Sequence, residues 1–167
     1  SLKTAILKER YMIYLDNAAT SYPKPETVYK EVERCMWDYC ANPGRGGHKM
    51  SIISGRAVMS AREVVSSFFN IKNPLQLCFM KNATEALNTA IKGYVSEKMH
   101  VVTTSMEHNA VARPLNVLKR DGVIELTIVE ANPYGEIDPE IIRKSIRKNT
   151  GLIVCTFSSN VNGTILP

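Results

Sequence analysis

The sequence contains few cysteines, and their spacing fits neither a metal site nor a disulfide framework. There are 4 cysteines in 167 residues, and no two of them form a CxxC pair. Cys78 and Cys155 lie in apolar runs typical of buried strands, so we interpret both as small core residues. Cys35 and Cys40 lie on a helical pattern. We therefore predict no metal site and a cytoplasmic protein, because disulfide frameworks belong to oxidising compartments.

Long apolar runs are also missing. No stretch reaches the length of about 20 apolar residues that a membrane-spanning helix needs. The amino terminus has no apolar core of a signal peptide. The sequence therefore predicts that no membrane is among its partners.

Basic residues exceed acidic ones only moderately. Lys and Arg number 21 and Asp and Glu number 16, which gives a net charge of +5. The densest basic run, residues 143–148, ends a predicted helix, where positive charge suits the negative end of the helix dipole. A nucleic-acid binder needs clustered basic residues interleaved with stacking aromatics, and the sequence has no such cluster. We therefore expect no nucleic-acid partner.

What is present is an ordinary globular composition, 44% hydrophobic and 22% charged, in which apolar runs alternate with helical patterns. Strands are predicted over residues 77–80, 100–105, 123–129 and 152–157, and helices over residues 86–95, 110–120 and from 139 onward. The strands are continuously apolar instead of alternating. This pattern predicts an α/β fold with a mainly parallel sheet and helices on both faces.

The part before this alternation is predicted to be mainly helical. Residues 3–10 are expected to form a polar arm and residues 11–15 a short strand. One face of a helix is marked by Val28, Val32, Cys35 and Tyr39. A second helix carries a broad apolar stripe from Ile53 to Phe68, and Ser51 or Ser54 is its expected cap.

The loop over residues 42–51 separates these two helices. Three glycines and a proline exclude regular structure there. The loop also carries Arg45, His48 and Lys49, and cationic side chains on a flexible backbone fit a ligand-binding loop as well as a plain connector. It is not a GxGxxG fingerprint and follows no strand, so we do not interpret it as a dinucleotide site.

The stretch from Lys81 to Asn88 is expected to turn from a strand into a helix. The first N–H groups of a helix are free and lie at the positive end of its dipole, so they bind anions. The small Ala83 would let an anion approach the backbone, and the hydroxyl of Thr84 could add a hydrogen bond. We predict that this turn holds a phosphate. The alternative is that Asn82 or Thr84 simply caps the helix.

Two further polar turns follow predicted strands, at residues 107–109 and 158–163. Ligands of parallel sheets bind outside the carboxyl ends of the strands, so these turns are expected to converge with the phosphate turn. His108 could stack on a planar ligand or move protons near neutral pH, and the alternative is an ordinary turn histidine. Asn160 could donate to a phenolate-type oxygen, and the alternative is a residue that stabilises its own turn.

Five motifs in one order carry a resemblance to a known family. They are residues 14–20 (YLDNAAT), the loop over residues 42–51, residues 82–88 (NATEALN), residues 106–109 (MEHN) and residues 159–164 (SNVNGT). Together they closely resemble the N-terminal part of class V aminotransferase-fold enzymes, with cysteine desulfurases as the best match. The resemblance covers nearly the whole chain. It departs from the family at Ala83, where some members carry a second threonine.

The resemblance implies pyridoxal 5'-phosphate as cofactor, a fold-type I homodimer and an amino-acid substrate. It implies that Ala83 and Thr84 hold the phosphate, that His108 stacks on the pyridine ring and assists catalysis, and that Asn160 binds the phenolic oxygen. Other residues are implied to lie near the substrate, the last two of them across the dimer interface. These residues are Asn17, Ala18, Ala19, Arg45 and His48.

The family's Schiff-base lysine and its nucleophilic cysteine lie beyond the last of these motifs, and no residue here matches them. We therefore expect residues 1–21 to be an arm or small-domain segment and residues 22–167 to be an incomplete large domain, inactive alone. The resemblance implies a cytoplasmic enzyme that takes sulfur from L-cysteine, yielding L-alanine and an enzyme persulfide. The sulfur would pass to an acceptor protein in iron-sulfur cluster assembly.

Two alternatives stay open. One is a selenocysteine lyase, or another lyase or epimerase, on the same scaffold. The other is a non-catalytic α/β domain that binds a phosphate or a nucleotide.

Overall fold

The computed structural model describes residues 13–167, so the arm predicted over residues 3–10 and the first residues of the predicted strand 11–15 lie outside it. The chain divides into two compact units between Cys78 and Phe79. Within the described range, none of the helices combines the length and the apolar character that a membrane span requires.

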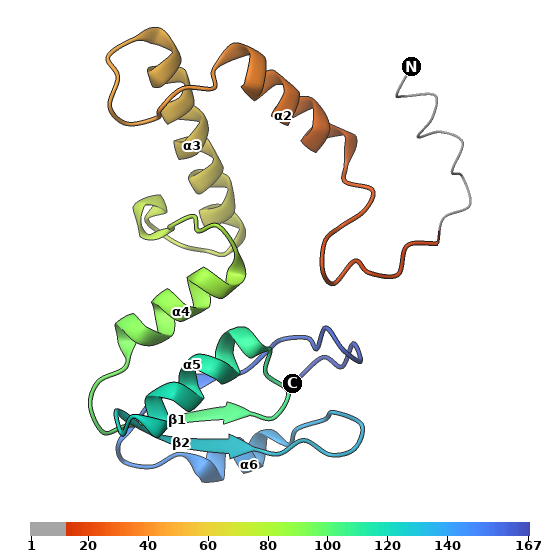
Figure 1. Ribbon diagram of the computed structural model, residues 1–167, viewed down its shortest axis with the longest axis vertical. Helices are drawn as coiled ribbons and strands as arrows, with labels where there is room; N and C mark the ends of the chain where they lie inside the picture. Colours follow the sequence, from red (N-terminus) through yellow and green to blue (C-terminus); the bar gives the residue numbers. More distant parts are fainter. Residues whose placement is uncertain (1–12) are drawn as a thin grey trace. The chain divides into compact units, whose positions relative to one another are not determined.

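The first unit is helical. It contains α2 (Glu26–Asp38), α3 (Lys49–Phe68) and a short 3-10 helix, η1 (Pro74–Gln76) (Figure 1). The two long helices confirm the predicted patterns. The loop predicted over residues 42–51 is confirmed only up to His48, because residues 49–51 already belong to α3. The remainder of the predicted strand 11–15 is wrong: Ile13 to Leu15 form no strand, and Ile13 and Leu15 are exposed. No neighbouring strand within residues 13–78 pairs with them, and an extended backbone needs such a neighbour.

The cap of α3 is His48, so the prediction of Ser51 or Ser54 was wrong. The His48 ring accepts a hydrogen bond from the Ser51 amide at its Nδ1, at 3.4 Å. Ser51 and Ser54 lie in the first and second turns of α3, and both residues are buried. Ser51 donates to the carbonyl of Asn42 at 2.8 Å, and Ser54 donates to the carbonyl of Tyr39. These serines therefore fasten the loop along α3 instead of starting the helix.

The second unit is built on a parallel sheet. Its strands are β1 (Met99–Thr104), β2 (Ile124–Val129) and β3 (Thr150–Val154), and its helices are α4 (Ala83–Tyr94), α5 (Asn109–Arg120) and α6 (Pro139–Ser145). The strand order is β2-β1-β3, with both neighbours parallel to β1. This arrangement confirms the predicted α/β fold, with β3 beginning and ending earlier than residues 152–157.

The strand predicted over residues 77–80 is absent. Leu77 to Met80 form neither a helix nor a strand, and Phe79 and Met80 are exposed. The apolar run was correctly identified, but a strand is stabilised by hydrogen bonds to a neighbour. No strand in the described part of the chain pairs with this segment.

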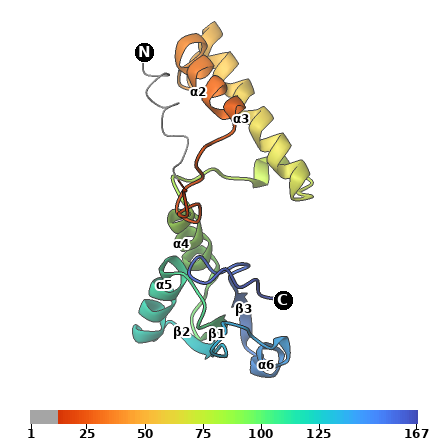
Figure 2. The same cartoon turned by 90° about the vertical axis from the view of Figure 1, so that its right-hand side faces the viewer.

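Helices cover both faces of the sheet, as predicted. Val101 and Val102 are fully buried and point to opposite faces, because successive side chains of a strand alternate. Val101 packs in a cluster with residues of α4, α5 and β2, whereas Val102 packs in a second cluster to which Ile142 of α6 contributes. Figure 2 shows α5 and α6 on opposite sides of the strands.

His100 lies buried in the central strand and joins all three strands. Its Nδ1 forms a hydrogen bond of 2.7 Å with the Thr150 hydroxyl on β3, and its Nε2 forms one of 2.8 Å with the Thr127 hydroxyl on β2. The side chain exposes none of its surface. Burial lowers the pKa of His100; the positive charge of Arg147 lowers it further, and Glu125 opposes these effects. The neutral imidazole is therefore the form that fits the fold.

The lowered pKa of His100 predicts that the protein loses stability in mild acid. An unfolded histidine binds a proton as the pH falls through about 6.5, and the folded one does so only at lower pH. The contribution is complete above about pH 6.5 and declines below it, toward the lower pKa of the folded state. Urea unfolding at about pH 7.5 and pH 5.5 measures this loss. A His100→Gln variant should be less stable at the higher pH but should lose less on acidification; equal losses would contradict the assignment.

Candidate functional site

The amino end of α4 is capped, as the plain alternative for this turn predicted. Asn82 accepts a hydrogen bond from the Glu85 amide through its Oδ1 at 2.9 Å, and the Glu85 carboxylate accepts one from the Lys81 amide at 2.9 Å. The first backbone bond of the helix runs from the Ala86 amide to the Asn82 carbonyl. Within residues 13–167, the amides of Ala83 and Thr84 have no acceptor. The cap therefore leaves two N–H groups free at the positive end of the dipole.

A proline inside α5 creates a need that α4 meets. Pro114 has no N–H, so it cannot donate to the carbonyl of Ala110 one turn earlier. The Asn88 side chain on α4 donates to that carbonyl at 3.2 Å and to the carbonyl of Thr84 at 3.0 Å. One amide group thus satisfies the orphaned acceptor in α5 and joins the start of α5 to the first turn of α4.

His108 lies where β1 leads into α5, and it caps that helix. Its Nδ1 accepts a hydrogen bond from the Ala110 amide at 3.1 Å. A nitrogen that accepts a hydrogen bond carries no hydrogen, so the hydrogen of the neutral ring lies on Nε2. The cap therefore fixes the ring's tautomer and leaves Nε2–H as a donor for a ligand.

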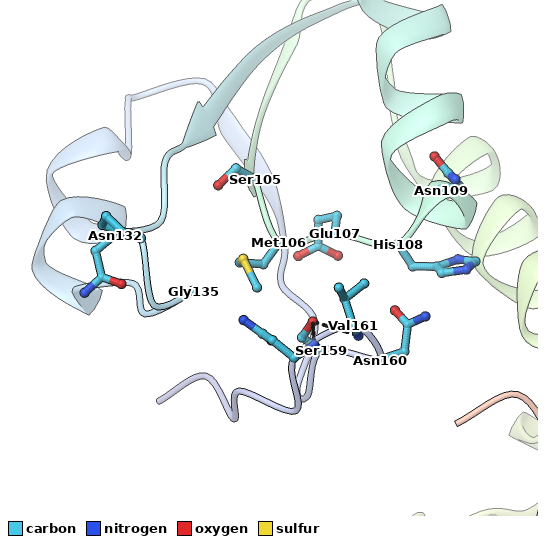
Figure 3. A pocket seen from close by; sticks show the side chains of 12 residues that line it. Ser105, Met106, Glu107, His108, Asn109, Asn132, Gly135, Ser159, Asn160 and Val161 are labelled. Atoms are coloured by element: carbon cyan, nitrogen blue, oxygen red, sulfur yellow. Dashed lines mark hydrogen bonds between the residues drawn. The ribbon is translucent and has the colours of Figure 1, made fainter. Parts of the chain in front are cut away.

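His108 lines two cavities. One, of about 530 Å³, is lined by Thr84, Asn88, Lys92, His108 and Arg113 among others. The other, of about 500 Å³, is lined by residues that follow the strands, including Glu107, His108 and Asn160 (Figure 3). Figure 3 shows His108 and Asn160 toward one end of this second cavity, with Asn132 and Gly135 toward the other. His108 lines both cavities, Thr84 only the first and Asn160 only the second, so the convergence of the three turns on one ligand stays a prediction.

Glu107 connects the ends of β1 and β3. Its Oε1 accepts a hydrogen bond from the Thr104 hydroxyl at 2.8 Å and one from the Thr156 amide at 2.7 Å. Its charge also acts on a thiol nearby: burial raises the pKa of Cys155, and the negative charge of Glu107 raises it further. Cys155 is therefore held as a thiol and is a poor nucleophile in this setting. Cys78 and Cys155 are both exposed, so their interpretation as core residues was wrong: Cys78 lies in a segment that forms no strand, and Cys155 follows the end of β3.

The predicted residues divide between the two units. Thr84, His108 and Asn160 line the cavities, whereas Ala83 lines neither and offers its free amide only. The remaining predicted residues belong to the first unit, and their nearness to a substrate stays a prediction. There, Arg45 lines a separate cavity of about 430 Å³ and His48 caps α3. These residues are Asn17, Ala18, Ala19, Arg45 and His48.

Sequence reasoning gave no role to Asn88, Glu107, Lys92 or Arg113. Thr84, Asn88 and Lys92 recur every four residues, so they share one face of α4, and that spacing could have indicated them. Pro114 was the second signal, because a proline inside a helix leaves a carbonyl that needs a donor. Nothing in the sequence showed that Glu107 reaches the strand end 49 residues later.

Comparison with known proteins gives a consistent result. Residues 13–167 match the family model described as aminotransferase class-V. A probable cysteine desulfurase of Borreliella burgdorferi is 33% identical over 161 residues, which cover 93% of this chain and 38% of the relative. The solved structure of SspA in complex with cysteine matches with a TM-score of 0.83 and 30% identity, over 93% of this chain and 45% of that one.

A second solved structure, the apo form of a cysteine desulfurase from Thermococcus onnurineus, also has a TM-score of 0.83, at 28% identity. The match covers 92% of this chain and 38% of that one. The chain therefore spans less than half the length of each of these proteins.

The two roles of the α4 turn can be separated by changing Asn82. Asn82→Asp keeps a capping oxygen, so the free energy of unfolding should stay within about 0.5 kcal/mol of the native value. Its negative charge should repel an anion at Ala83 and Thr84, and a titration of the Thr84 amide signal with inorganic phosphate measures that loss. Asn82→Ala is the matched variant and should cost about 1 kcal/mol of stability. Undiminished phosphate binding by Asn82→Asp would contradict the anion site.

The link between Asn88 and Pro114 predicts a non-additive pair of substitutions. Asn88→Ala leaves the Ala110 carbonyl without a donor and should destabilise the protein by about 1–3 kcal/mol. Pro114→Ala returns a backbone N–H to that carbonyl. In the Pro114→Ala background, Asn88→Ala should therefore cost about 1 kcal/mol less, measured as a double-mutant cycle by urea unfolding. Strict additivity of the two substitutions would show that Asn88 does not serve this carbonyl.

Proposed function

The chain belongs to the aminotransferase class-V family, and from this premise we propose that the protein is a pyridoxal 5'-phosphate enzyme that takes sulfur from L-cysteine. The observation that carries the proposal is that His108 lines two cavities, one together with Thr84 and one together with Asn160. Pyridoxal phosphate has a phosphate, a flat ring and a phenolic oxygen, and each needs its own contact. Thr84, His108 and Asn160 would supply these three contacts in that order.

The residues present fit the cofactor. The amides of Ala83 and Thr84 have no acceptor within residues 13–167, and together with the Thr84 hydroxyl they would hold the phosphate. The exposed ring of His108 would stack on the pyridine, and the amide of Asn160 would donate to the phenolic oxygen. The cofactor, when bound, supplies an electron sink that the protein orients.

His108 would also hold a proton for the reaction. Its Nδ1 is occupied by the Ala110 amide, so the neutral ring would carry its hydrogen on Nε2 and would donate a hydrogen bond from there to bound ligand. To give up the Nε2 proton as an acid, the ring would first take up a proton at Nδ1, and that would cost the cap of α5.

The substrate is proposed from the relatives. Two of them are named as cysteine desulfurases, and one solved relative is a complex with cysteine. The C–S bond of L-cysteine would break and its sulfur would form an S–S bond with a thiol of the protein. The carbon would take up a proton, so the products are L-alanine and a protein persulfide. Asn17, Ala18 and Ala19 would lie near the substrate, and the loop with Arg45 and His48 would close the site across a homodimer interface.

The sulfur acceptor and the domain division are also proposed from the relatives. The persulfide sulfur would pass to an acceptor protein, as in iron-sulfur cluster assembly in the cytoplasm. Residues 22–167 would form the first part of a large cofactor-binding domain, with residues 1–21 as an arm or small-domain segment. A selenocysteine lyase, or another lyase or epimerase on this scaffold, would use the same cofactor residues.

One observation favours a second candidate, a non-catalytic protein that binds a nucleotide. Lys92 and Arg113 line the cavity that begins at Thr84, and neither forms an ion pair within the described residues. Two cations beyond a phosphate turn suit a ligand with more than one phosphate. Such a protein would bind a nucleoside diphosphate in competition with inorganic phosphate and would not respond to pyridoxal phosphate.

The proposed function is tested with the polypeptide that contains this chain, pyridoxal phosphate and L-cysteine. We expect a visible absorbance band from the bound cofactor, L-alanine as product, and sulfide released by a thiol reductant in equal amount. Replacing L-cysteine by L-selenocysteine tests the lyase alternative. Cofactor binding without L-alanine would contradict the desulfurase activity, and binding of a nucleoside diphosphate in place of the cofactor would support the second candidate.

Thr84 gives the sharpest variant for the cofactor. Thr84→Val removes one hydroxyl that donates to a charged phosphate and should weaken pyridoxal phosphate binding by about tenfold or more. Thr89→Val on the same helix is the matched control, because Thr89 is exposed and lines neither cavity. Cofactor fluorescence measures both affinities. Equal affinities for the two variants would show that the Thr84 hydroxyl does not reach the phosphate.

A further inference from the structure

Glu107 links the end of β1, which leads into His108, to the segment after β3, which leads to Asn160. It lies next to His108 in the chain, and its Oε1 accepts hydrogen bonds from the Thr104 hydroxyl and the Thr156 amide. Thr104 ends β1, and Thr156 follows the end of β3. Figure 3 shows the carboxylate between β1 and the loop that carries Ser159 and Asn160.

The loop that carries Asn160 is internally braced, so it moves as a unit with its base. The Ser159 amide donates to the Thr164 carbonyl at 2.9 Å, and the Leu166 amide donates to the Phe157 carbonyl at 3.0 Å. Within the loop, the Ser159 hydroxyl accepts from the Val161 amide at 3.2 Å. A shift at Thr156, just before the loop, would therefore carry Asn160 with it.

We propose that Glu107 is a positioning residue: it fixes the loop that carries Asn160 at a set distance from His108 and thereby determines the width of the cofactor cavity. This inference rests on the proposed function, because it assigns His108 to the ring face and Asn160 to the phenolic oxygen of one ligand. Glu107 acts through Thr156 and does not itself touch the ligand.

The geometry requires a single oxygen that accepts two hydrogen bonds, and a negative charge is not essential to it. A glutamine side chain also presents one carbonyl oxygen with two lone pairs, so it can replace the carboxylate in this role. An alanine cannot. Glu107→Gln and Glu107→Ala therefore separate positioning from charge.

The first measurement does not need the cofactor. The Thr156 amide donates to Glu107, so its hydrogen exchange reports the contact directly. In the polypeptide that contains this chain, we expect Glu107→Ala to speed exchange at Thr156 by about tenfold or more and Glu107→Gln to leave it near the native rate. Glu97→Ala is the matched control: Glu97 precedes β1 as Glu107 follows it, and it forms no hydrogen bond within residues 13–167.

The second measurement is the dissociation constant for pyridoxal phosphate, from cofactor fluorescence. We expect Glu107→Ala to weaken binding by about tenfold and Glu107→Gln to restore it to within about twofold of native, with Glu97→Ala unchanged. If Glu107→Gln binds as weakly as Glu107→Ala, the charge acts on the ligand itself and the positioning role is overturned. Unchanged affinity in Glu107→Ala, with Thr156 exchange accelerated, overturns it as well.

The two proposals fail in different ways. If the native polypeptide binds no pyridoxal phosphate, the proposed function fails, whereas the exchange rates at Thr156 still decide whether Glu107 fixes the loop. If the native polypeptide binds the cofactor and Thr156 exchanges at the native rate in Glu107→Ala, the positioning role alone fails.

Discussion

The second unit depends on one side-chain amide, that of Asn88. Pro114 removes a backbone donor from the middle of α5 and leaves the Ala110 carbonyl unpaired by its own helix. An unpaired buried carbonyl costs about 1–3 kcal/mol, which is a large part of the stability of a small domain. Asn88 meets this need from α4 and also binds the Thr84 carbonyl. The proline thus makes the contact between the two helix starts obligatory, and those starts carry Thr84 and His108.

Glu107 joins two strand ends by hydrogen bonds, as Asn88 joins two helix starts. Asn88 holds the α4 turn against the start of α5, and Glu107 holds the end of β3 against the end of β1. His108 lies between the two contacts and is itself held by the cap it makes for α5. All three interactions have a backbone group as one partner, and those of Asn88 and Glu107 join segments that are distant in sequence. The side chains of Thr84 and Asn160, which line the cavities, are then not needed to hold these turns in place.

The sequence predicted the repeating elements better than the contacts between them. Continuous apolar runs and helical periodicity depend on neighbours close in sequence, so the parallel sheet and its covering helices were found correctly. The runs at residues 11–15 and 77–80 failed because a strand is completed by a partner, which periodicity does not reveal. Serine is a common capping residue, but at this helix start the ring of His48 accepts the hydrogen bond from the free amide of Ser51. The Ser51 hydroxyl donates instead to the Asn42 carbonyl in the loop. Asn88 and Glu107 act on residues 22 and 49 positions away, beyond any local pattern.

The turn at Lys81 to Asn88 shows why a structural role and a binding role should not be treated as rivals. A helix start offers several free N–H groups, and a side-chain cap occupies only one of them. Asn82 caps the Glu85 amide, and the amides of Ala83 and Thr84, which lie closer to the helix end, have no acceptor in the described part of the chain. By holding the helix start in place, the cap keeps those two amides parallel, which is the arrangement that an anion needs. The same reasoning applies to His108, whose cap fixes its tautomer and so decides which nitrogen faces a ligand. In both turns the interaction that looks purely structural is what makes the free donor specific.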